Sequence, residues 1–228
     1  MSTVHWRRVR SFVRRPGRIT ASQARALATL LPRFGIEFRD ACLDLDAEFG
    51  RTAERVLDIG FGDGETLLTA AVNNPDVDFL GVEVHEPGIG HLLVMLERAG
   101  VTNVRIIQRD VVDVIEHMIP GRSFDVVNIF FPDPWPKKRH HKRRLIQAPF
   151  LAKLTQTMKH GALLHIATDW DDYAEQIADV LGSSFEIGVC PSEELEGRRL
   201  AARGPTKFER RGRRIGHTVR DFYYSRLR

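Results

Sequence analysis

Short apolar runs rich in β-branched residues alternate along the chain with segments whose apolar residues recur at helical spacing. The apolar runs predict strands at residues 55–59, 79–84, 104–108, 124–130, 162–168 and 185–190. The segments between them predict helices at residues 65–72, 90–98, 111–118, 143–158 and 173–181. Strands that alternate with crossover helices are typical of a parallel sheet covered on both faces. The pattern therefore predicts an α/β fold with a doubly wound, mostly parallel sheet.

Both ends of the chain depart from this alternation. Residues 217–226 include the β-favouring run 219–224, which predicts an antiparallel edge strand on the sheet. Near the N-terminus "RPG" and "LPRFG" interrupt the pattern and leave a single short helix, at residues 22–30. We therefore expect one compact domain, with a basic arm and a short helix over residues 1–50 and the main α/β unit over residues 51–228.

Composition bounds the class of protein. The 228 residues are 43% hydrophobic, which is enough for a sizeable core. Apolar runs are too short to cross a bilayer, and the arginines at the N-terminus lack the apolar block of a secretory signal, so we expect a soluble, cytoplasmic protein with no membrane partner. An organellar transit peptide is the alternative interpretation of the arginine-rich N-terminus. Cys42 and Cys190 lie outside any metal-ligand spacing, and both are expected in the core.

Charge is distributed unevenly although the net charge is only +4. Three acid-poor basic blocks occupy residues 7–33, 137–144 and 198–228, and the last contains only two acids, Glu209 and Asp221. One such block is usually a solvated face. Three of them favour a nucleic acid as the partner.

The segment "VLDIGFGDGET" places Gly60, Gly62 and Gly64 between the first strand and a helix. Glycine permits a tight turn and a close approach of the backbone to a ligand. The spacing is not that of dinucleotide binders, and Asp63 stands where a pyrophosphate would meet the helix N-terminus, so a phosphate is disfavoured. Asp58, at the end of the first strand, suits a ligand with an ammonium or sulfonium group.

Acids also follow the second and third strands. Glu83 ends "FLGVEV", where a carboxylate accepts hydrogen bonds from ribose hydroxyls, and Asp110 in "QRD" is placed to accept from an adenine amino group. Each of these features alone is a weak signal, and a purely structural turn is the alternative interpretation of the glycine segment. Their occurrence at three successive strand ends favours S-adenosylmethionine as the cofactor.

The segment "FFPDPWPKKRHHKRR" follows the fourth strand. Phe131, Asp133 and Trp135 each precede a proline, which predicts extended backbone at three alternate positions. A polyproline ligand or rigid linker is disfavoured because the segment directly follows a predicted core strand. We interpret the prolines as fixing the Asp133 carboxylate beside the methyl donor. Trp135 or Phe131 could stack on a base. Packing of these aromatic side chains at the strand end is an equally good interpretation.

This segment, with "IGFGDGE", "FLGVEVH", "ATDW", "PTKFERRG" and "RSFVRRPGRIT", closely resembles the bacterial tRNA (guanine-N7)-methyltransferase family known as TrmB, from about residue 10 to residue 221. The resemblance implies a Rossmann-like methyltransferase fold and formation of 7-methylguanosine at position 46, in the variable loop of tRNA. We expect no metal, and the sequence leaves open whether the protein is a monomer or a homodimer. The chain departs from the family pattern at Asp58, where glutamate is usual, and at Thr218 and Arg220.

The resemblance also implies roles for individual residues. S-adenosylmethionine would be held by Asp58, Glu83, Asp110 and Asp133, with Asp133 also the catalytic candidate. Substrate contacts would come from Lys137, Asp169, Thr206, Lys207, Phe208, Glu209 and the basic stretch Arg139, His140, His141, Lys142, Arg143, Arg144. The two histidines are better interpreted as RNA-facing donors than as a metal pair, because no third ligand is near in sequence. A helix N-cap is the competing interpretation of Asp169.

Other functions fit less well. Methyltransferases that act on an exocyclic amino group usually carry [DN]-P-P-[YFW] after the fourth strand, whereas here two prolines flank the acid. A cytosine-C5 mechanism needs a cysteine in the active loop, and there is none. A noncatalytic RNA-binding module would not need the intact acids. The glycine spacing and Asp63 disfavour a nicotinamide oxidoreductase.

Overall fold

The computed structural model describes residues 11–12, 17–196, 198, 200, 209 and 218–227. Within these residues seven strands form one sheet in the order β3-β2-β1-β4-β5-β7-β6. Strands β1 to β5 are parallel, and β7 is antiparallel to both of its neighbours. The strands are β1 (Arg55–Ile59), β2 (Asp78–Glu83), β3 (Val104–Gln108), β4 (Phe124–Phe130), β5 (Met158–Thr168), β6 (Ile187–Val189) and β7 (Arg220–Arg226).

The doubly wound, mostly parallel sheet is confirmed. The antiparallel strand expected near the C-terminus is present as β7, but it lies one strand in from the edge because β6 pairs along its outer side. Strand β5 begins at Met158 instead of residue 162, since a register shift against β4 lets Phe124 pair with Met158 before regular pairing starts.

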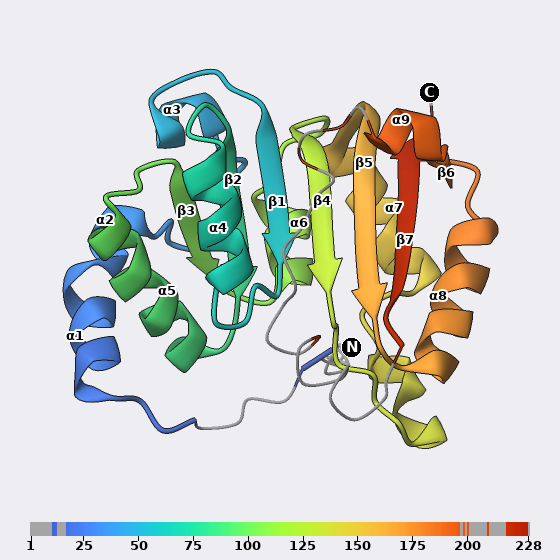
Figure 1. Ribbon diagram of the computed structural model, residues 1–228, viewed down its shortest axis with the longest axis horizontal. Helices are drawn as coiled ribbons and strands as arrows, with labels where there is room; N and C mark the ends of the chain where they lie inside the picture. The colour runs from blue at the N-terminus through green and yellow to red at the C-terminus, as the bar shows by residue number, and fades with distance from the viewer. Residues whose placement is uncertain are drawn as a thin grey trace, which may run out of the picture.

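Helices cover both faces of the sheet, and Figure 1 shows α4 in front of it and α6 and α7 behind it. One hydrophobic cluster joins α1, α2, α4 and α5 to the front face, and a second joins α3, α6, α7 and α8 to the back. The helices are α1 (Ala21–Thr29), α2 (Leu31–Phe34), α3 (Leu45–Phe49), α4 (Glu65–Asn73), α5 (Glu86–Ala99), α6 (Val111–His117), η1 (Lys138–Arg143), α7 (Ala148–Thr157), α8 (Asp171–Gly182) and α9 (Ser192–Glu196).

The helix expected at residues 143–158 is shorter than the pattern predicted. Helix α7 begins at Ala148, and Pro149 stands in its first turn, where a missing N–H costs nothing. The basic residues before it form η1, a separate 3-10 helix with no buried residue. The run "KRHHKR" is thus presented at the surface rather than built into α7.

The N-terminal elements pack on the front face and on the outer side of β3. In α1, the Gln23 amide donates to the Pro87 carbonyl (3.1 Å) at the start of α5. Farther along, the Ile36 amide donates to the Ile106 carbonyl of β3 (2.8 Å). This bridge covers part of an edge that would otherwise expose unpaired backbone groups. The division of the chain at residue 50 stays a prediction.

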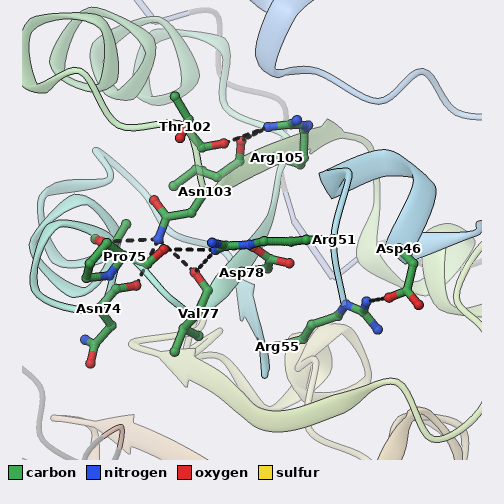
Figure 2. A network of polar contacts seen from close by, with 12 residues as sticks. Asp46, Arg51, Arg55, Asn74, Pro75, Val77, Asp78, Thr102, Asn103 and Arg105 are labelled. Atoms are coloured by element: carbon green, nitrogen blue, oxygen red, sulfur yellow. Dashed lines mark hydrogen bonds and ion pairs between the residues drawn. The ribbon is translucent and has the colours of Figure 1, made fainter. Parts of the chain in front are cut away.

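A dense polar network lies at the amino ends of the strands (Figure 2). The Arg51 guanidinium donates to the buried Asp78 carboxylate (2.8 Å from Nε) and to the Pro75 carbonyl (3.0 Å). The Asn103 amide donates to three carbonyls, at 2.7 Å from Val77, 3.0 Å from Asn74 and 3.2 Å from Ala71. These bonds join the loops that enter β2 and β3, so they stabilise this end of the sheet.

Cys190 is buried as expected, but Cys42 is exposed, because it lies in the loop before α3 rather than in an element. In the part of the chain that the structure describes, no helix combines the length and apolar character needed to cross a bilayer.

Candidate active site at the carboxyl ends of the strands

The strand order reverses between β1 and β4, and ligands bind at such a switch point in open α/β sheets. In Figure 1 the arrowheads of β1, β4 and β5 point toward the same lower end of the sheet. Because parallel strands end together, their C-terminal residues and loops bring Asp58, Glu83, Asp110, Asp133 and Asp169 to this end. The predicted acids from five strands therefore share one side of the molecule.

The glycine loop has the backbone that only glycine adopts readily. Gly60, Gly62 and Gly64 have φ of 72°, 63° and 78°. The loop also packs closely against α5, since a Cβ on Gly88 would lie 2.0 Å from the Gly62 carbonyl oxygen. A side chain at any of these glycines would strain the turn.

Glu83 already holds this loop. Its carboxylate accepts from the Gly62 amide (2.9 Å) and from the amides of Val84 (2.6 Å) and His85 (2.9 Å). A carboxylate has about four acceptor positions, so roughly one remains for a ribose hydroxyl. Glu83 thus fixes the glycine loop, and a ribose contact at Glu83 stays a prediction.

Asp58 lies in a row of polar side chains that crosses the sheet. It pairs in register with Gly81 of β2 and Asn128 of β4, and Asn128 pairs with His165 of β5. Paired residues on parallel strands point to the same face, so Asp58, Asn128 and His165 all lie on the front face. His165 is bonded to Asp221 of β7 (2.7 Å).

The Asp58 carboxylate and the Asn128 amide oxygen in this row are both buried acceptors. Asp58 is 4% exposed, and burial, followed by the nearby Glu83 charge, raises its pKa to about 7. Among the described residues no cation pairs with the Asp58 carboxylate, and the buried Asn128 carbonyl oxygen accepts no hydrogen bond. A buried acceptor left without a donor costs about 1–3 kcal/mol, which a bound ammonium group would recover.

Asn128 is the residue that sequence reasoning missed. The strand predicted at residues 124–130 is confirmed as β4, but the prediction did not single out position 128 within it. A signal was available in retrospect, because Asn is depleted in strands and here interrupts a run of apolar residues.

Asp110 begins α6. Its carboxylate accepts from the Val112 amide (3.1 Å), so it acts as the helix N-cap. A cavity of about 330 Å³ lies beside it, and the cavity wall includes Val112, Lys142 and Arg143. Asp110 is therefore positioned at a hollow next to the basic run.

The loop after β4 holds Asp133 exposed at the carboxyl end. The expectation of extended backbone is wrong for its flanking aromatics, since Phe131 has φ of 52° and Trp135 of 46°. The turn is held against this preference by bonds from the Phe131 amide to the Ala167 carbonyl (2.8 Å) and from the Trp135 indole to the Ser11 carbonyl (2.9 Å). Left-handed backbone at such residues costs roughly 1–3 kcal/mol each and is typical of functional sites.

The basic run divides into exposed and buried members. Lys137, Arg139 and Lys142 are exposed, whereas Arg143 lies over the Trp135 ring at 5.0 Å. His140 meets the same ring edge-on, and desolvation together with neighbouring cations such as Arg139 lowers its pKa. His141 is 3.5 Å from the Asp172 carboxylate.

Arg144 differs from the rest of the run because it is only 2% exposed. Its guanidinium donates to the Pro134 carbonyl (2.8 Å), to Gln176 (2.7 Å) and to Asp172. The sequence predicted a contact between Arg144 and RNA, but the structure does not present this side chain to RNA. The side chain is turned inward, because the protein itself supplies its acceptors.

Asp169 follows β5 and precedes α8. The N-cap of α8 is Trp170, with no side-chain cap, so the helix-cap interpretation of Asp169 is wrong. Glu209 is buried, at 3% exposed. Thr206, Lys207 and Phe208 lie outside the described residues.

Comparison with known proteins agrees with this geometry. Residues 52–222 match the family model described as "Putative methyltransferase". A tRNA (guanine-N(7)-)-methyltransferase of Halorhodospira halophila is 52% identical over 225 residues, covering 97% of this chain and 96% of that protein. One of Burkholderia vietnamiensis is 50% identical over 224 residues, covering 98% and 87%.

Solved structures share the fold at low identity. The 16S rRNA methyltransferase KamB matches with a TM-score of 0.55 and 16% identity, over 80% of this chain and 94% of that one. TrmN from Thermus thermophilus matches with a TM-score of 0.54 and 16% identity, over 80% and 47%. Together, the glycine loop, the acids at the strand ends and relatives that align over nearly the whole chain show that the protein belongs to the tRNA (guanine-N7)-methyltransferase family.

Proposed function

We propose that the protein transfers a methyl group from S-adenosylmethionine to N7 of the guanine at position 46 in the variable loop of tRNA. One observation supports it above the others. The buried Asp58 carboxylate, with no cation paired to it among the described residues, and the Asn128 amide oxygen, with no donor, lie at the same end of the sheet as the constrained, exposed Asp133. The relatives named as tRNA (guanine-N(7)-)-methyltransferases support the choice of substrate.

The residues present fit the cofactor. S-adenosylmethionine supplies an electrophilic methyl group on a sulfonium and carries an ammonium group. Asp58 and Asn128 would accept from that ammonium, and the glycine loop lets the backbone come close. Asp110 beside its cavity would accept from the adenine amino group, and the remaining acceptor position of Glu83 would serve the ribose.

Asp133 would hold the base. Guanine N7 has an in-plane lone pair and no proton to remove, so the reaction needs position more than a general base. An exposed carboxylate that accepts from the N1 and N2 hydrogens would orient N7 toward the methyl group. It would also offset the positive charge that the base gains.

The exposed cations would hold the RNA backbone. Lys137, Arg139 and Lys142 follow Asp133 by only four to nine residues in the sequence, so phosphates beside the target base fall within their reach. Such contacts set the register of the RNA, while the base contact gives specificity. Asp169, on the next loop, would meet the substrate from the α8 side.

The direct test is to incubate the purified protein with methyl-labelled S-adenosylmethionine and unmodified tRNA, and then to map the labelled nucleotide. The expected product is 7-methylguanosine at position 46. Label on an exocyclic nitrogen would instead select the amino-directed class of methyltransferase, and cofactor binding without transfer to tRNA would contradict the proposed substrate.

The role of Asp133 is tested by Asp133→Asn. The amide keeps the shape but turns one acceptor into a donor toward the N1 and N2 hydrogens, so kcat at saturating cofactor should fall about 100-fold. The dissociation constant for tRNA, measured by filter binding, should change little. Turnover within about twofold of the unsubstituted protein would remove Asp133 from the mechanism.

A further inference from the structure

All the nitrogens of the Arg144 guanidinium form hydrogen bonds within the protein. Its side chain is 1% exposed, against 58% for its partner Asp172. Besides its bonds to Pro134, Gln176 and Asp172, the guanidinium carbon lies 4.8 Å from the centre of the Tyr173 ring. A buried cation is tolerated only when it is paired and hydrogen-bonded, and here each nitrogen has an acceptor.

The partner on the loop side is the carbonyl of Pro134, the residue that follows Asp133. Pro132, Pro134 and Pro136 have no N–H, so the backbone around Asp133 has few groups through which it can be tied down. Nε of Arg144 donates to the Pro134 carbonyl, which belongs to the peptide group that joins Pro134 to Trp135. This bond therefore acts on a turn whose two ends, Phe131 and Trp135, are held in left-handed backbone.

The partners on the other side belong to α8, which is firmly packed. Asp172 and Gln176 lie one turn apart on that helix, and Gln176 also donates to the Ile146 carbonyl (3.0 Å). The Tyr173 hydroxyl accepts from the Ile146 amide (3.0 Å), and the Tyr173 side chain is fully buried. Arg144 thus joins the Asp133 turn to an element that cannot easily move.

We propose that Arg144 is a positioning residue that clamps the Pro132–Asp133–Pro134 turn to α8 and so fixes the Asp133 carboxylate for methyl transfer. The effect on turnover rests on the proposed function. The clamp itself is a property of the fold that can be measured without substrate. Arg144 then differs in role from Arg139 and Lys142, which are near it in sequence but exposed.

The main test is Arg144→Lys, which keeps the positive charge but cannot reach Pro134, Gln176 and Asp172 together. With tRNA and cofactor both saturating, kcat should fall about 10- to 100-fold, because a small displacement of an orienting group is enough to misalign the reacting atoms. Cofactor affinity by calorimetry and the salt dependence of tRNA binding should stay within about twofold. Amide hydrogen exchange at Phe131 and Trp135 should accelerate at least tenfold.

The matched control is Arg51→Lys, at the opposite end of the sheet. Arg51 also binds an aspartate and backbone carbonyls, so this variant should lose stability. At a permissive temperature its kcat and its rate of amide exchange at Phe131 should match those of the unsubstituted protein. Equal losses of kcat in the two variants would make Arg144 merely structural and overturn the proposal. A reduced salt slope for Arg144→Lys would overturn it in favour of an RNA contact.

Two further measurements keep the outcome decisive. If Arg144→Lys does not fold, Gln176→Leu removes one anchor of the clamp and should accelerate exchange at Phe131 by a smaller factor; unchanged exchange would contradict the clamp. If the unsubstituted protein does not methylate tRNA, the proposed function fails alone, and faster exchange at Phe131 in Arg144→Lys still supports the clamp, whereas unchanged exchange refutes it.

Discussion

Asp58 and Asp78 are buried aspartates at opposite ends of neighbouring strands, 4% and 1% exposed. Asp78, at the start of β2, is paired with the Arg51 guanidinium at 2.6 Å and belongs to the network in Figure 2. Asp58, near the end of β1, has no cation beside it among the described residues, and its pKa is raised to about 7. The same residue type serves structure where the fold supplies the partner, and we propose that it serves cofactor binding where the fold does not.

The largest expected effect removes the partner of Asp78. In Arg51→Met the Asp78 charge is buried without compensation, so the free energy of unfolding should fall by about 3 kcal/mol, at the low end for such pairs because Arg51 is itself 39% exposed. Urea unfolding measures this value. A loss below about 1 kcal/mol would mean that Asp78 depends little on Arg51, and that the two buried aspartates do not differ in their need for a partner.

The matching change at the other end is Asp58→Asn. Because no ion pair of Asp58 with another described residue is broken, the free energy of unfolding should be unchanged or higher. Affinity for S-adenosylmethionine should fall about 10- to 100-fold, because the ammonium group loses a charged acceptor. Calorimetry and urea unfolding on the same sample decide it: lost stability with unchanged affinity would reverse the assignment.

The raised pKa of Asp58 predicts a pH dependence. Cofactor binding should strengthen up to tenfold per pH unit as pH rises toward about 7 and level off above it, because the ammonium group requires the ionised carboxylate. The stability of the cofactor-free protein changes with pH in the opposite direction. The pKa of Asp58 is about 7 in the folded protein and 3.8 in the unfolded chain. The free energy of unfolding therefore falls as pH rises between these two values, by up to about 1.4 kcal/mol per pH unit.

Two measurements separate these effects. Calorimetric titration of the cofactor near pH 6 in two buffers of different ionisation enthalpy should show proton release, and Asp58→Asn should abolish it. Unfolding of the cofactor-free protein between pH 5 and 7 should show a shallower pH dependence in the same variant. Equal proton release in both proteins would assign the titration to a group other than Asp58.

The smallest expected effect concerns the exposed cations at the carboxyl end. Replacing Arg139 and Lys142 by alanine should reduce the slope of log affinity for tRNA against log salt by about 1.5, since each phosphate contact releases about 0.7 to 0.9 of a counterion. Lys159→Ala, at the amino end, where Lys159 pairs with Asp125 (2.7 Å), should leave the slope unchanged. Equal slopes in all three proteins would remove η1 from the RNA interface.

The sequence alone determined the features that depend on local pattern. Alternating strands and helices, the glycine turn and the proline-flanked acid are short-range signals, because they follow from side-chain periodicity and backbone sterics within a few residues. The C-terminal β-favouring run likewise predicted β7. The acids at three strand ends favoured S-adenosylmethionine and the basic blocks favoured a nucleic acid, and the family resemblance added the particular tRNA substrate.

Only the tertiary structure decided which residues of one type do different work. Arg144 and Lys142 are two positions apart in one basic run, yet one is buried against α8 and the other is exposed. Asn128 became a candidate only when strand register placed it beside Asp58. These outcomes depend on contacts between segments far apart in the chain, since burial and the presence of a partner set the energy of a charge or an amide, and neither can be seen along the sequence.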